Sequence, residues 1–176
     1  MKKINQYIQE KLVIDKNVNT RKYNYHPKDK DELKSLIANL IEERGNEADL
    51  NDIDISNITD MSHIFYDSEF NGNISKWDVS KVTDMEAMFE YSKFNGNISK
   101  WDVSKVIDMS WMFGYSKFNG NISNWNVNNV IDMHDMFYKS KFNQDISKWN
   151  VSNVKDMKHI FVHCPLEKNP PTWHHE

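Results

Sequence analysis

The sequence contains few of the residues that cross-link small proteins or interrupt their helices and strands, namely cysteine, glycine and proline. Its 176 residues include a single cysteine, Cys164, which excludes an intrachain disulfide framework. Glycine and proline are scarce, with 5 and 4 residues, whereas Met, Phe and Trp are abundant, with 9, 9 and 6. A chain this aromatic has ample apolar surface to bury, so it is not of the disordered class.

Long hydrophobic runs are also missing. No stretch approaches the roughly 18–20 consecutive apolar residues of a membrane span, which excludes an integral membrane protein. The first seven residues contain two lysines with no apolar run after them, so they do not form a secretory signal. From this we expect a cytoplasmic protein.

Neither sign of charge dominates strongly. The formal net charge is −4, which argues against general binding of nucleic acid, because that function needs a basic surface. Residues 1–49 carry a net charge of +1 and residues 50–176 a net charge of −5. The acidic part is better suited to a protein partner with a basic surface.

What the sequence does contain is a period of 24 residues. The pair Asp-Met begins at 60, 84, 108, 132 and 156, and the tryptophans and phenylalanines keep the same interval. The recurring aromatic residues are Trp77, Trp101, Trp125 and Trp149, then Phe65, Phe89, Phe113, Phe137 and Phe161, and finally Phe70, Phe94, Phe118 and Phe142. We therefore divide the chain into an N-terminal helical cap (1–49), a repeat solenoid (50–169) and a C-terminal tail with a repeat fragment (170–176).

The pattern inside one unit changes from strand-like to helix-like. Trp77 and Val79 are two residues apart, as on one face of a strand. Met85, Met88 and Phe89 have the spacing of one side of a helical turn, and Asp84 stands where an N-cap would. A unit of this length cannot bury its own apolar face, but stacked units can. The predicted fold class is α/β, a leucine-rich-repeat-like solenoid of short parallel strands and short helices with a helical N-terminal cap.

The cap is predicted from a second apolar pattern. Leu33, Leu36, Ile37, Leu40 and Ile41 are spaced as one face of an amphipathic helix. Asp29 with Glu32 resembles a capping box, and Gly45 stands where a helix-ending glycine is common. A weaker helical stripe runs through Ile4, Tyr7, Ile8 and Leu12.

The unit F-N-x-x-I-S-x-W-x-V-x-x-V-x-D-M-x-x-M-F resembles the leucine-rich repeat of BspA-like bacterial surface proteins, common in mycoplasma, lactobacillus and gut-bacterial proteins. The resemblance covers about residues 50–163. It implies a solenoid fold and a role in protein interaction. Many family members are long, secreted and anchored, so it also implies a bacterial surface adhesin as one alternative function.

Residues with possible catalytic or metal-binding chemistry recur with the period, which favours structural roles. An enzyme needs a special pair of carboxylates in different environments, whereas the aspartates at 60, 84, 108, 132 and 156 are equivalent. His159 and His163 have a spacing that can chelate zinc on a helix, but His159 occupies a variable outward position. Cys164 replaces the serines of other units at a turn. We expect no catalytic residue, no metal and no cofactor.

One aromatic residue breaks the periodic pattern and suggests a binding surface. Trp111 occupies the place held by His63, Ala87, Asp135 and His159 in other units, on the outward side of the predicted helix. With Tyr91 and Tyr115, and with Lys93 and Lys117 at the rim, it forms the predicted binding site. The alternatives are that Trp111 lies flat on its neighbours, or that the partner binds the strand face around Lys76, Lys100, Asn124 and Lys148.

The predicted function is that of a non-catalytic protein–protein interaction module. Two alternatives stay open. One is a phage or mobile-element-encoded inhibitor that covers a basic surface of a host enzyme, in which case the chain acts in the host cytoplasm. The other is the surface adhesin. All three predict a protein partner of unknown identity, and none involves a membrane or nucleic acid.

Overall fold

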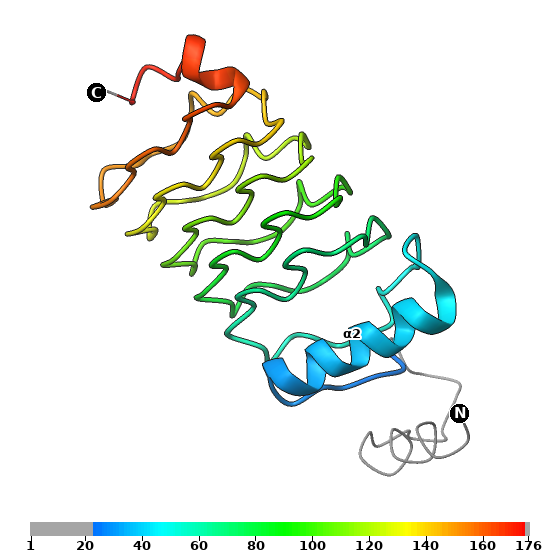
Figure 1. Cartoon of the computed structure of the whole chain (residues 1–176). Helices are drawn as coiled ribbons and strands as arrows, with labels where there is room; N and C mark the ends of the chain where they lie inside the picture. Colours follow the sequence, from blue (N-terminus) through cyan, green and yellow to red (C-terminus); the bar gives the residue numbers. More distant parts are fainter. Residues whose placement is uncertain (1–22, 175–176) are drawn as a thin grey trace.

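The computed structural model of the chain describes residues 23–174. Helix α2 (Lys30–Arg44) lies across one end of an elongated stack of layers, and the short 3-10 helix η1 (Pro165–Lys168) lies at the other end (Figure 1). Each layer between them corresponds to one 24-residue period. The stacking is seen directly in the parallel bridges, which join Asp60 to Asp84, Asp84 to Asp108, Asp108 to Asp132 and Asp132 to Asp156.

The predicted α/β class is wrong. Between residues 45 and 164 the structure contains neither a named strand nor a helix, and the backbone pairing consists of isolated bridges. The cause is a turn every few residues. The Trp77 N–H donates to the Ile74 carbonyl (3.2 Å), and the Val82 N–H donates to the Val79 carbonyl (2.9 Å). A chain that bends so often cannot stay extended long enough to build a sheet.

The predicted helices at the Met-x-x-Met-Phe positions are also absent, for a different reason. Ala87 and Tyr91 have φ of 49° and 57°, and every equivalent residue in the other layers is likewise left-handed. A right-handed helix requires φ near −60° throughout. Instead, the N–H groups of Met88, Glu90 and Ser92 donate to the carbonyls three residues earlier, which makes a series of linked turns. We call residues 84–92 and their equivalents the turn segment.

Layers are joined by backbone hydrogen bonds and by apolar columns. In the turn segment, the N–H groups of Met85, Ala87 and Phe89 donate to carbonyls of the next layer at 2.9–3.0 Å. The tryptophans with the 24-residue period form a column, the Trp column. Trp101 is core: it is 4% exposed and stacks on Trp77 with ring centroids 6.5 Å apart. Its indole N–H donates to the Ile74 carbonyl (3.3 Å).

The recurring polar residues complete the turns. The Oδ1 atom of Asp84 accepts the Glu86 N–H (2.9 Å), which is a turn stabilised by a side chain and not a helix cap. The Oδ1 atom of Asn71 accepts the Asn95 N–H (2.8 Å), and this contact repeats from Asn95 to Asn119. The asparagines at this position of the period therefore form a column in which each side-chain oxygen accepts a backbone N–H of the next layer.

The predicted helix around residues 33–41 is confirmed as α2. Asp29 accepts the Glu32 N–H (2.9 Å), and the Gly45 N–H donates to the Ile41 carbonyl (2.8 Å). Leu33, Leu36, Ile37 and Leu40 are buried against the first layer. The stripe through Ile4, Tyr7, Ile8 and Leu12 lies outside the described residues. No helix within residues 23–174 combines the length and apolarity needed to cross a membrane.

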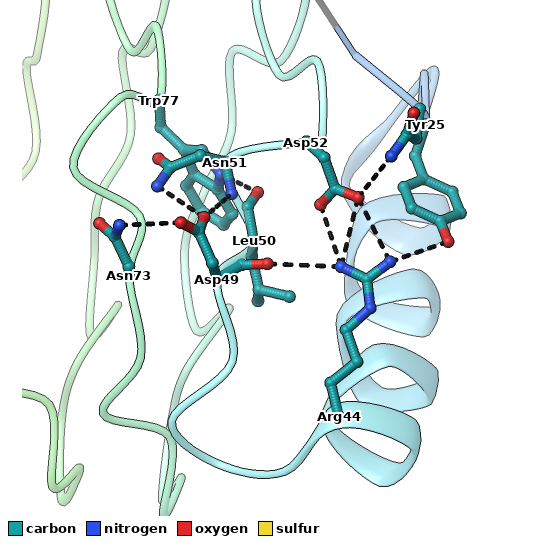
Figure 2. A network of polar contacts seen from close by, with 9 residues as sticks. Tyr25, Arg44, Asp49, Leu50, Asn51, Asp52, Asn73 and Trp77 are labelled. Atoms are coloured by element: carbon teal, nitrogen blue, oxygen red, sulfur yellow. Dashed lines mark hydrogen bonds and ion pairs between the residues drawn. The ribbon is translucent and has the colours of Figure 1, made fainter. Parts of the chain in front are cut away.

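Polar contacts lock α2 onto the first layer. Figure 2 shows the Arg44 guanidinium bonded to the Asp52 carboxylate (3.2 Å), the Asp49 carbonyl (3.3 Å) and the Tyr25 hydroxyl (3.1 Å). At the other end of the helix, the Lys30 ammonium bonds both oxygens of Asp60 at 3.1 Å. The helix thus stands where a preceding layer would lie.

Candidate protein-binding surface

The turn segments bring exposed aromatic side chains of successive layers into contact. Tyr66 and Tyr91, which are 46% and 44% exposed, meet edge to face with ring centroids 5.9 Å apart. The contacts continue across the next two layers. We call the set the outer aromatic row; it consists of Tyr66, Tyr91, Trp111, Tyr115 and Tyr138.

The three aromatic residues predicted from the sequence do come together. Tyr91 and Tyr115 stack with ring centroids 4.4 Å apart, and Trp111 lies nearly parallel to Tyr115 at 6.4 Å. The predicted lysines contribute differently. Lys93 pairs with the Glu69 carboxylate, and Lys117 is exposed. The cation that does face the rings is Lys139, whose ammonium lies 5.3 Å from the Tyr115 centroid and 5.1 Å from that of Tyr138.

Trp111 is half-buried and does not project freely. Its indole N–H donates to Nε2 of His134 (3.1 Å), and its ring meets Tyr138 edge to face. Gly114 lies under the indole: a Cβ atom there would stand 2.9 Å from Cε3 of Trp111. The glycine therefore makes room for the indole to lie along its own turn, which matches the flat arrangement left open as an alternative.

The Asp132 carboxylate determines which ring nitrogen of His134 carries the proton. Nδ1 of His134 lies 2.7 Å from Oδ1 of Asp132, which as a carboxylate can only accept. Nδ1 therefore carries the proton, and Nε2 is left to accept from Trp111. Burial alone would lower the pKa of His134, but the hydrogen bond and charge of Asp132 outweigh it and raise that pKa.

Acidic side chains border the row. Burial, together with the charges of Glu86 and Asp135, raises the pKa of Glu90 to about 6. Burial and the neighbouring Asp60 and Asp108 raise the pKa of Asp84. Carboxylates thus lie close to the aromatic rings, together with the Lys139 ammonium, and they can contact cationic groups of a partner.

Sequence reasoning missed Tyr66, Tyr138 and Lys139. Tyr66 and Tyr138 share one position of the period with Glu90 and Gly114, directly before the position of Tyr91. A helical interpretation separates adjacent positions by about 100° of rotation. Linked turns instead place both positions on one edge of the stack. The adjacent residues Tyr138 and Lys139 were therefore the feature of the sequence that could have extended the predicted site.

One of the remaining reactive groups, His163, touches this row. His159 stands beside Asp135 (3.6 Å), whereas the ring of His163 packs on Tyr138. Cys164 is buried, and burial raises the pKa of its thiol. Among residues 23–174 no three potential metal ligands gather at one place. The expectation of a non-catalytic, metal-free and cofactor-free protein stays a prediction.

The family of the chain follows from a comparison with family models. The chain belongs to the family described as "Mycoplasma protein of unknown function, DUF285", whose model matches residues 32–138 and, in a second match, residues 92–174. No curated protein and no solved structure matches it. Family membership therefore assigns the chain to a class whose function is itself open.

Proposed function

We propose that this chain is a non-catalytic protein-binding module and that the outer aromatic row is its contact surface. One observation carries the proposal: five aromatic side chains from four successive layers touch one another along one edge, with Tyr66 and Tyr91 nearly half exposed. Large aromatic rings give contact area at a small cost in conformational entropy, and they are enriched at the energetic centres of protein interfaces.

The backbone under the row supports this function. Tyr91 and Tyr115 stand on turns whose N–H groups donate to the next layer at 2.9 Å and 2.7 Å. Rings fixed in this way lose little freedom on binding, so more of the contact energy is available for affinity. The acidic border and the net charge of −5 over residues 50–176 favour a partner with a basic surface.

The test compares two variants with matched exposure. Tyr91→Ser removes an exposed ring from the row, and Ile107→Ser removes an exposed apolar side chain that has no ring contact; the two residues are 44% and 46% exposed. A partner identified with the natural chain should bind the Tyr91 variant at least about tenfold more weakly, because hot-spot truncations cost about 2 kcal/mol. It should bind the Ile107 variant normally. Equal binding of both variants would place the contact elsewhere.

The alternatives differ in where the chain acts. The resemblance to BspA-like surface repeats and the membership of a Mycoplasma family favour the adhesin over the phage-encoded inhibitor. An adhesin is accessible to protease added to intact cells that express it naturally. An inhibitor is protected from that protease and co-purifies with a cytoplasmic enzyme. Both alternatives keep the outer aromatic row as the contact surface.

A further inference from the structure

The hydrogen bonds between turn segments run in one direction. In each junction, alternate residues of one layer donate their N–H groups to carbonyls of the following layer. Between the last two turn segments, Met133 donates to Asp156, Asp135 to Lys158, Phe137 to Ile160 and Lys139 to Val162, at 2.8–3.1 Å. By the same geometry, the final turn segment directs the N–H groups of Met157, His159, Phe161 and His163 away from the stack.

Only one of these four donors has a partner among residues 23–174. The His163 N–H donates to the Glu167 carboxylate (3.1 Å). The N–H groups of Met157, His159 and Phe161 are unpaired within that range. All three residues line a cavity of about 520 Å³ at this end of the stack, which we call the end cavity. Backbone N–H groups are strong donors, so these three can donate to carbonyls of another segment that enters the end cavity.

The end cavity lies where half of a further layer would stand. Trp173 continues the Trp column, and its indole N–H donates to the Ile146 carbonyl (2.9 Å), as the other tryptophans do. The described residues therefore build the tryptophan half of that layer but not its Asp-Met-x-x-Met-Phe half. The final turn segment is correspondingly less covered, since Met157 is half-buried whereas Met133 is fully buried.

We propose that the end cavity binds a peptide segment of a partner protein that folds there as a further turn segment. Its alternate carbonyls would accept from Met157, His159 and Phe161, as the carbonyls of each following layer do elsewhere in the stack. An apolar side chain of the segment would cover Met157, which is half-buried. An acidic residue in the segment would meet Lys155 and Lys158, which line the end cavity. Asp156 and Glu167 line it too, but each already accepts a backbone N–H, from Lys158 and His163. This site is distinct from the outer aromatic row.

Two observations favour a peptide over the other occupants. Three donors on alternate residues match a row of carbonyls, whereas one small anion cannot reach all three. A second copy of the chain could offer such carbonyls from its first turn segment, but α2 covers that end and Lys30 holds Asp60 there. Head-to-tail association would therefore require that the helix be displaced.

The first test uses a peptide with the chain's own sequence 130–140, blocked at both ends, against the natural full-length chain. We expect saturable 1:1 binding by calorimetry and slower hydrogen exchange at Met157, His159 and Phe161. At about 100 times the Kd, the melting temperature should rise by about 5–10 °C. A scrambled peptide should not bind. Equal binding of the scrambled peptide, or no binding of either, would overturn the proposal.

The second test fills the end cavity covalently. The chain is extended by residues 177–187 with the sequence of residues 153–163, so that Asp-Met falls at 180–181, in register with the period. This extension should raise the melting temperature and reduce binding of the 130–140 peptide at least about tenfold, whereas a scrambled extension should change neither. Undiminished peptide binding to the in-register extension would show that the peptide binds elsewhere.

A charge variant keeps the proposal testable if the extension does not fold. The Lys158 side chain is 79% exposed, so Lys158→Glu should leave the fold intact. It should weaken peptide binding by about 3–10-fold, because it reverses one charge beside the end cavity. Lys148→Glu, at an exposed lysine that does not line the end cavity, is the matched control. Equal loss in both variants would indicate a non-specific charge effect and would contradict the proposal.

Discussion

The Trp column and the outer aromatic row use the same kind of side chain in opposite ways. Trp101 is buried, and its indole N–H bonds a backbone carbonyl of the preceding layer. Trp111 is half-buried, and its indole N–H bonds a side chain, His134. The first contact can be repeated in every layer because every residue has a carbonyl. The second exists once, because it depends on His134 and Gly114, and so only the second can carry specificity.

The largest effect is expected in the Trp column. Trp101→Ala should lower the free energy of unfolding by about 3–5 kcal/mol, because it leaves a cavity between layers and removes the indole hydrogen bond to the Ile74 carbonyl. Urea denaturation followed by circular dichroism measures the loss. A loss under about 1 kcal/mol would mean that the column is not the core of the stack.

The next effect separates binding from stability. Trp111→Ala should weaken partner binding by about 2 kcal/mol, whereas the free energy of unfolding should fall by about 1 kcal/mol, since the ring is only half-buried. Affinity and denaturation are measured on the same preparation. If Trp111→Ala destabilises the chain as much as Trp101→Ala, the distinction between column and row fails.

A smaller effect tests why Trp111 lies flat. Gly114→Ala should cost about 1 kcal/mol of stability, because the new Cβ would stand 2.9 Å from the indole and displace it. In a double-mutant cycle, Gly114→Ala should cost nothing further once Trp111 is alanine. An unchanged cost in the double variant would assign the strain to the backbone.

The smallest effect concerns the acidic border of the row. The pKa of Glu90 is raised from 4.5 to about 6 in the folded chain, so the folded state holds this proton more tightly than the unfolded state. Stability therefore falls as pH rises from about 4.5 to 6, and the full penalty is present above that range. Because the side chain is partly exposed, the penalty should be below about 1 kcal/mol. Glu90→Gln should raise the melting temperature at pH 7.5 and leave it unchanged at pH 4; an equal gain at both values would exclude this carboxyl as the cause.

The sequence was sufficient to predict the period, the stacking of the units and helix α2. Each rests on a pattern that only one arrangement satisfies: Leu33, Leu36 and Leu40 with a cap at Asp29 define one face of a helix. The secondary structure inside the layers was not predictable in this way. Met85, Met88 and Phe89 face inward in a helix and equally in linked turns, so their spacing cannot distinguish the two.

The residues that decide between a helix and linked turns cannot be recognised from the sequence. Ala87 and Tyr91 are left-handed, yet neither is a glycine, and an alanine normally favours a helix. The same difficulty affected the proposed binding surface. Trp111, Tyr91 and Tyr115 were found because they are aromatic, but Tyr66, Tyr138 and Lys139 join them only through the turn geometry.

The left-handed residue near the end of each turn segment determines how freely the side chain at that position can vary. Asp67, Tyr91, Tyr115, Lys139 and His163 all have φ between 51° and 58°. The backbone thus accepts an acid, a phenol, an amine and an imidazole at the same place with the same conformation. Substitutions in this column can therefore change the charge and shape of that edge while the backbone of the stack keeps its conformation.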